Sequence, residues 1–301
     1  MMKPFLAAMI LFICAPVFAD EYSVPVNQSQ SPTPAQPSNL TFSNFFTEGW
    51  NQEWTKRVTP GGAPDMALLH VQTNFLEREF RTDYYNQQNV ASDDHGHVSF
   101  LDGLIAYGLN RRFMIEVVGN YQWKNSRKAG NDISGAAAAV VGRLQLVDVP
   151  GSSLAYNFRV NTPNSGLGVN QTEFINAIAG WQDLTRFGLK RVGLYYSVQL
   201  DTYAGPAAVG SEHNDLLYDV SLAKTWTDPD TFLLGNFTTF AEVYATSYLD
   251  GSKHGQTVVN ATPGIRLTLG HGNVLMGGVD LPVSTPLDFN ATYRLTYIYN
   301  F

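Results

Sequence analysis

The sequence predicts an all-β fold, namely a transmembrane up-and-down antiparallel β-barrel of about twelve strands. Apolar and polar residues alternate in segments of about ten residues from Met66 to the C-terminus, the pattern of strands whose side chains face opposite sides. Short and long connections alternate between these segments, as in barrels that insert into a membrane from the short-turn side. Gly, Tyr and Phe are abundant and Lys and Arg are few, a composition that favours strands over helices.

The first residues have the pattern of a secretory signal peptide. Residues 1–19 combine a basic start, an apolar run and a small residue, Ala19, at the expected cleavage position. Pro4 and Pro16 leave an apolar run shorter than the ~20 residues that a membrane-spanning helix needs. The only cysteine, Cys14, lies in this leader, so the mature chain is expected to lack disulfides. We therefore expect Sec-type export in a Gram-negative bacterium. Separately, the net charge of −7 disfavours nucleic acid as a partner.

Two segments precede the predicted barrel. Residues 20–39 are rich in Pro, Ser and Gln without periodicity, which predicts a flexible tether. Residues 40–65 are rich in large aromatic residues. Ser43 is a candidate N-cap for a short helix that would carry these residues, although Gly49 within it disfavours a helix. This segment is predicted to dock inside or under the barrel as a plug; docking beside the barrel and a disordered leader are the alternatives. The plug candidates are Phe45, Phe46, Trp50 and Trp54.

The alternating segments place the strands of the barrel in residues 66–301. The predicted strands are 66–83, 98–109, 112–124, 135–148, 153–161, 174–183, 190–203, 215–226, 231–248, 257–269, 273–283 and 289–301. In the first and the ninth of these the apolar set changes face, which suggests a β-bulge. Because the count is even, both ends of the barrel chain are expected at the short-turn end.

The two faces of the strands differ in charge. The apolar faces are nearly free of charge, whereas the polar faces carry charged residues that would be costly in the sealed core of a soluble barrel. We therefore expect the apolar faces toward lipid and the polar faces around a water-filled lumen, with a secreted β-sandwich as the alternative. Aromatic residues near the strand ends would form two interfacial girdles: Tyr121 and Trp123 at the long-loop end, and Trp181, Trp226, Tyr297 and Tyr299 at the short-turn end.

Inward-facing side chains are the candidates for the lumen wall and for solute binding. They are Glu116, Arg143, Arg159, Arg191, Tyr195, Asp201, Asp219, Phe240, Glu242, Arg266 and Arg294. Their charged members form either a network that stiffens the wall or a constriction that orders polar solutes. Their aromatic members make the lumen amphipathic, which suits small solutes that combine a ring or chain with polar groups.

The chain ends on a strand, "FNATYRLTYIYNF", which is expected to pair with the first strand and so to leave no sheet edge. Its alternating aromatic residues Tyr297, Tyr299 and Phe301 are similar to the C-terminal signal read by the outer-membrane assembly machinery. Outer-membrane lipids and that machinery are the expected partners, and the oligomeric state is left open.

Enzymatic activity, metal and other cofactors are not predicted. Residues 92–97, "SDDHGH", are the densest run of possible metal ligands, but a loop of this kind lacks preorganisation and no matching cluster occurs elsewhere. A lipid-face hydrolase with a Ser–His dyad is a further alternative, in which the base would be His70, the one histidine within a predicted strand.

The stretch "FFTEGWNQEW" and the following "GGAP", within Phe45–Pro64, resemble Gram-negative outer-membrane proteins of the phenol-degradation MetA-pathway transporter family. The resemblance implies a barrel that admits hydrophobic or aromatic compounds, and it transfers no functional residue. Together with the amphipathic inward face, it predicts an outer-membrane channel for passive uptake of small amphipathic solutes. A non-conducting barrel that binds a ligand or partner through its extracellular loops is the alternative.

Overall fold

The computed structural model describes residues 38–56, 61–90, 96–126, 131–164, 170–205, 213–229, 231, 234–285 and 289–301. The signal peptide predicted for residues 1–19 lies outside the described residues, as do residues 20–37 of the predicted tether. Ser38–Phe301 form a single folded unit.

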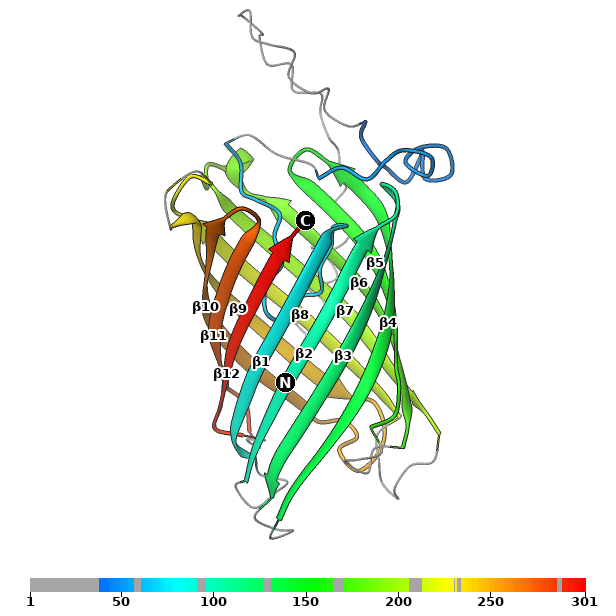
Figure 1. Ribbon diagram of the computed structural model, residues 1–301, viewed down its shortest axis with the longest axis vertical. Helices are drawn as coiled ribbons and strands as arrows, with labels where there is room; N and C mark the ends of the chain where they lie inside the picture. The colour runs from blue at the N-terminus through cyan, green and yellow to red at the C-terminus, as the bar shows by residue number, and fades with distance from the viewer. Residues whose placement is uncertain are drawn as a thin grey trace, which may run out of the picture. The chain divides into compact units, whose positions relative to one another are not determined.

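Twelve antiparallel strands close into a barrel (Figure 1). Each strand pairs with its neighbours in sequence, and the last strand pairs with the first, so no sheet edge is open. The strands are β1 (Arg78–Val90), β2 (Gly96–Gly108), β3 (Phe113–Ser126), β4 (Asn131–Val149), β5 (Ser152–Asn161), β6 (Thr172–Asp183), β7 (Val192–Ala204), β8 (Asn214–Thr225), β9 (Gly235–Tyr248), β10 (Thr257–Gly270), β11 (Asn273–Pro282) and β12 (Ala291–Asn300). The predicted fold class and the closure by the last strand are confirmed.

The two-residue connections β4–β5 and β10–β11 lie at the same end of the barrel as the C-terminus (Figure 1). We call this end the short-turn end and the other the long-loop end. The β10–β11 turn, His271–Gly272, has φ values of 50° and 79°, as a two-residue type I′ hairpin turn requires. The β6–β7 turn contains the 3-10 helix η3 (Thr185–Phe187). In the part of the chain that the structure describes, no helix is long and apolar enough to cross a membrane.

The outward face of the barrel is apolar. Large hydrophobic side chains stand exposed on many of the strands, among them Ile105, Val117, Val140, Leu222, Val243, Ile265 and Leu295. Exposed aromatic side chains lie nearer the strand ends: Tyr121, Trp123, Trp226, Tyr297 and Tyr299. Soluble monomers rarely expose so much contiguous apolar surface, whereas a lipid-facing band with aromatic borders requires it.

Trp181 is the exception among the predicted girdle residues. Its side chain is 3% exposed and faces inward, in register with Tyr195. Alternation could not reveal this orientation because β6 carries apolar residues on both faces, such as Ile175 inward and Ile178 outward. The apolar residues on its inner face are covered by protein and not by lipid.

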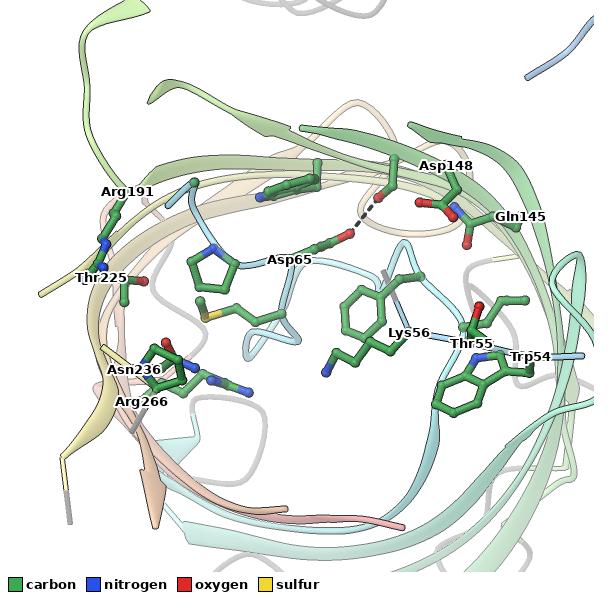
Figure 2. A pocket seen from close by; sticks show the side chains of 18 of the residues that line it. Trp54, Thr55, Lys56, Asp65, Gln145, Asp148, Arg191, Thr225, Asn236 and Arg266 are labelled. Atoms are coloured by element: carbon green, nitrogen blue, oxygen red, sulfur yellow. Dashed lines mark hydrogen bonds between the residues drawn. The ribbon is translucent and has the colours of Figure 1, made fainter. Parts of the chain in front are cut away.

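The predicted first strand, 66–83, is two structures. β1 begins at Arg78, and residues 62–77, which we call the lumen segment, run inside the barrel without regular secondary structure (Figure 2). Its apolar side chains share a cluster with the wall: Ala63, Met66, Leu68, Val71, Trp181, Tyr195, Ala223 and Phe240. The change of face in the sequence therefore marks the boundary between this segment and β1, and the bulge predicted in the first strand is wrong. The bulge predicted in the ninth strand agrees with the pairing of β9 and β10, whose register shifts between Arg266 and Thr268.

Residues 38–56, which we call the rim segment, form turns at the short-turn end and not the predicted helix. Leu40 makes an isolated antiparallel bridge to Asp148 near the end of β4. Arg112 of the β2–β3 turn is fully buried and donates hydrogen bonds to three backbone carbonyl oxygens of the rim segment. Gly49, with φ at 87°, adopts the left-handed conformation that ends helices, so the aromatic residues on either side do not share one helical face.

Candidate functional site

The lumen segment is a reversal of the chain whose two arms are joined by hydrogen bonds. Asn74 Nδ2 donates to the carboxylate oxygens of Asp65 at 3.0 and 3.2 Å. Ser153 of β5 donates to Asp65 Oδ2 at 2.8 Å and is also hydrogen-bonded to Asn74, so the wall fixes both arms. Residues 66–73 form the tip between the arms.

A carboxylate of β9 holds the tip. Glu242 is fully buried; its Oε1 accepts the backbone N–H of Leu69 at 2.9 Å and its Oε2 accepts that of His70 at 2.7 Å. Hydrogen bonds to an ionised carboxylate are about twice as strong as neutral ones. Gly278 of β11 makes room beside this latch, because a Cβ there would lie 2.5 Å from Leu69 Cδ1.

The side chain of His70 fixes the tip to the same side of the wall, through β9 and β11. Its Nε2 lies 2.8 Å from Asp280 Oδ1 on β11, and its ring stacks on Tyr244 of β9 with 3.8 Å between centroids. Arg294 of β12 donates to the other oxygen of Asp280 at 2.7 Å. Side chains of β9, β11 and β12 therefore hold His70 of the lumen segment, directly or through Asp280.

The second arm is bound through its backbone carbonyls. Arg143 Nη1 of β4 donates to Phe75 O at 2.8 Å, and Asn157 Nδ2 of β5 donates to Thr73 O at 3.1 Å. Gln145 Nε2 donates to the carbonyl oxygen of Asn74 at 3.0 Å. An irregular segment inside a barrel has no ladder partner, so these side chains satisfy its backbone in place of water.

Two cavities flank the lumen segment. The mouth cavity, of about 450 Å³, lies at the short-turn end, where Trp54 of the rim segment, Met66 and Phe75 of the two arms and Arg266 of β10 line it (Figure 2). The tip cavity, of about 180 Å³, lies beside the tip of the segment. Its ionisable lining residues include His70, Glu77, Glu79, Arg81, Asp83, Asp102, Glu116, Arg143, Arg159 and Arg294.

Asp65 lines the mouth cavity and joins the two arms. Burial raises the pKa of its carboxyl to about 7, although the hydrogen bonds from Ser153 and Asn74 favour the charged form. Asp148 raises the pKa further by repulsion, and Lys56 lowers it by attraction. The junction of the arms therefore changes charge near neutral pH.

Most of the side chains predicted to face inward do so. Glu116, Arg143, Arg159, Tyr195, Asp201, Asp219, Phe240, Glu242, Arg266 and Arg294 are buried in the barrel or line its cavities. Of these, Arg143, Tyr195 and Glu242 bond directly to the lumen segment. Arg191 lies before β7 in the turn, with φ at 54°, forms an ion pair with Asp228 and lines the mouth cavity. Their roles in solute binding stay predictions.

The four aromatic plug candidates lie at the short-turn end of the barrel, and one of them reaches a cavity. Trp54 lines the mouth cavity, whereas Phe45, Phe46 and Trp50 stay in the turns of the rim segment. Phe46 is 90% exposed, and the Phe45 ring lies 5.0 Å from the guanidinium carbon of Arg112. The buried arginine holds this aromatic group at the rim.

Several site residues were missed by the reasoning from sequence. Asp65, His70, Gln72 and Asn74 carry the polar contacts of the lumen segment. From the sequence, Asp65 is expected at the end of the aromatic segment 40–65, and the other three in the first predicted strand. The signal was present in "HVQTN", residues 70–74, where polar residues occupy both parities and no single apolar face can form.

The alternative function, a lipid-face hydrolase, is expected to use His70 as its base, and the position of His70 does not fit this role. His70 is bound to Asp280 inside the lumen, so it cannot serve a dyad that faces lipid. Among the described residues, no group of three or more His, Cys, Asp or Glu residues is arranged to hold a metal ion. Of the metal-like run 92–97, residues 92–95 lie outside the described residues.

Comparisons with known proteins bear on the fold. No protein-family model and no curated protein matches the chain. The COG4313 outer membrane channel from Pseudomonas putida F1 superposes with a TM-score of 0.59 and 13% identity, covering 81% of this chain and 100% of that chain. This chain has the fold of an outer-membrane β-barrel. The NanC porin superposes with a TM-score of 0.52 and 11% identity, over 74% of this chain and all of that one. The resemblance to the MetA-pathway family stays a prediction.

Proposed function

We propose that this chain is a channel of the Gram-negative outer membrane for passive uptake of small amphipathic solutes, closed at rest by the lumen segment. The observation that carries the proposal is how this segment is held. Wall side chains of β4, β5, β7, β9 and β11 bond to it, and it forms no strand of the sheet. Such bonds can be exchanged for bonds to water while the closed sheet stays intact, so the segment can move without unfolding the barrel.

The outward surface supports the membrane location. An apolar band with aromatic residues near the strand ends suits a bilayer, and the barrel shares its fold with an outer membrane channel and a porin. Tyr297 and Tyr299 face outward on β12, and Phe301 follows at the exposed C-terminus. We assign these three residues to recognition by the outer-membrane assembly machinery.

The two cavities support the solute class. The mouth cavity combines Trp, Phe, Met and Leu side chains with charged ones, whereas the tip cavity is lined mainly by charged and polar groups. A solute that crosses both must satisfy apolar and polar surroundings in turn. Small molecules with a ring or short chain and a polar group meet this requirement.

Liposome swelling tests the proposal. Residues 67–73 are replaced by Gly and Ser at equal length, and swelling is recorded in graded sugars and in small aromatic solutes. The variant is expected to admit solutes faster than the wild type because the tip can no longer fill the lumen. Replacement of the rim residues 42–48 in the same way is the matched control. Equal swelling of all three proteins would contradict closure by the lumen segment.

A non-conducting barrel that binds a ligand through its loops is the second candidate. One observation favours it: Asp250, beyond β9, accepts hydrogen bonds from the backbone N–H groups of His213 and Asn214 and so ties two loops at the long-loop end. An ordered loop pair suits a binding surface. Swelling that stays absent after the tip is replaced, in a folded barrel, would favour this candidate.

A further inference from the structure

We propose that the mouth cavity is a binding site for small organic carboxylates with an apolar body, and that Arg266 and Lys56 hold the carboxylate. The inference deepens the proposed channel function and rests on it for a role in uptake. Binding itself requires no open pore, because the cavity faces the short-turn end of the barrel.

Arg266 is the first observation. It stands on β10, is 8% exposed and lines the cavity, yet its Nε has no hydrogen-bond partner among the described residues. Two other lumen arginines differ: Arg143 pairs with Glu77 and Glu116, and Arg294 pairs with Asp280. Burial of a guanidinium without an acid is costly, so this position favours an anion supplied from outside the chain.

Lys56 is the second observation. It extends from the rim segment, and Figure 2 shows Lys56 and Arg266 directed toward each other from opposite sides of the cavity. Its Nζ lies 5.7 Å from the centroid of the Phe75 ring, and no ion pair joins it to a described carboxylate. Two cations that face one space repel each other, and a carboxylate between them would relieve that repulsion.

The acids that line the same cavity are already engaged. Asp65 accepts hydrogen bonds from Asn74 and Ser153, and Asp148 pairs with Arg111 at 3.4 Å. Neither therefore neutralises the two facing cations by direct contact. The fourth cation of the cavity, Arg191, pairs with Asp228 and does not compete for the ligand.

The rest of the lining defines the body of the ligand. Trp54, Pro64, Met66, Phe75, Leu76 and Trp181 surround the same space. A cavity of about 450 Å³ accommodates a single ring or a short chain. Inorganic phosphate or sulfate would leave these apolar side chains in contact with water. The apolar lining therefore favours a carboxylate attached to a ring.

Calorimetric titration of benzoate into the full mature protein in detergent micelles tests the site. Saturable binding is expected, with benzamide, the neutral isostere, bound about tenfold more weakly because it forfeits charge-assisted hydrogen bonds. Arg266→Gln and Lys56→Gln should each weaken benzoate binding and leave benzamide binding nearly unchanged. Arg186→Gln, an exposed basic residue of η3 outside the cavity, is the matched control.

Heat-modifiable electrophoretic migration verifies that each variant is a folded barrel. Equal affinity for benzoate and benzamide, or benzoate binding untouched by both cavity variants, would overturn the inference. Liposome swelling separates it from the proposed function. Binding without swelling in the tip-replaced variant would contradict the channel and support the site, whereas swelling without binding would contradict the site and support the channel.

Discussion

The rim segment and the lumen segment both precede β1, but they are held in opposite ways. The rim segment is rich in aromatic residues and lies at the short-turn end, where Arg111 and Arg112 donate to its carbonyl oxygens. The lumen segment is poorer in aromatic residues and lies inside, bonded by side chains from several strands. The difference shows that a segment can lie inside a polar lumen when side chains of the wall form hydrogen bonds with its backbone. Its content of aromatic residues does not determine whether it lies inside.

The number of anchors also differs. The rim segment is held by two neighbouring arginines of one turn and by the bridge between Leu40 and Asp148, so loss of one arginine should loosen it. The lumen segment depends on many partners around the barrel, of which Glu242 alone bonds two consecutive backbone N–H groups. Single substitutions can therefore test whether the two segments have separate roles.

Glu242→Ala is expected to have the largest effect. Each charge-assisted hydrogen bond that it removes contributes about 1.5–3 kcal/mol to holding the tip. Two such bonds together contribute about 3–6 kcal/mol. Because 1.4 kcal/mol is a factor of ten, the ratio of closed to open channels should fall by about 100- to 10,000-fold. Planar-bilayer recording measures this ratio. Glu242→Gln, which keeps one good acceptor, should give a ratio between those of the wild type and Glu242→Ala. An unchanged ratio in folded Glu242→Ala would mean that the tip does not close the lumen.

Arg112→Ala should release the rim segment and leave conductance nearly unchanged. Several hydrogen bonds from one buried guanidinium are lost, each contributing about 1.5–3 kcal/mol. Limited proteolysis should therefore cleave residues 38–56 faster than in the wild type. Arg186→Ala, at an exposed arginine of the same end, serves as the control. If conductance rose as much as in Glu242→Ala, the rim segment would belong to the closure and the contrast would fail.

Much of the barrel was predictable from sequence, and the contrast explains the part that was not. β3, β7 and β10 follow the predicted strands within two residues because each has one apolar face toward lipid, and period-2 alternation then has a single cause. β6 broke the rule at Trp181, since its inner face is covered by the lumen segment and is apolar as well.

The candidate site was predictable only in part. Parity alone placed Glu242, Arg143 and Arg266 inside the lumen. Parity does not say what a side chain meets there, so the latch of Glu242 on the tip and the unbonded Nε of Arg266 could not be derived. Those contacts join residues separated by up to 173 positions, for which a single sequence carries no signal.

A pH dependence should distinguish the two segments further. The Asp65 carboxyl ionises near pH 4 when free and near 7 in the docked segment, so docking is strongest below about pH 4. Its stability falls as the pH rises toward 7, where the docked carboxyl ionises at a cost. Channel opening should therefore increase severalfold between pH 5 and pH 8, and Asp65→Asn should flatten the profile. An unchanged profile in Asp65→Asn would assign the dependence to another group.

Phe46→Ala should have the smallest effect. The side chain is 90% exposed and makes an edge contact with Phe45, with 5.1 Å between the ring centroids. Substitutions at such sites change stability by about 0.5 kcal/mol or less, so conductance and proteolysis of the rim segment should both match the wild type. Leu69→Ala is the matched change in the tip, where the side chain approaches Gly278, and it should open the channel more readily. If Phe46→Ala opened the pore and Leu69→Ala did not, the aromatic rim segment would close the channel and the lumen segment would not, contrary to the proposal.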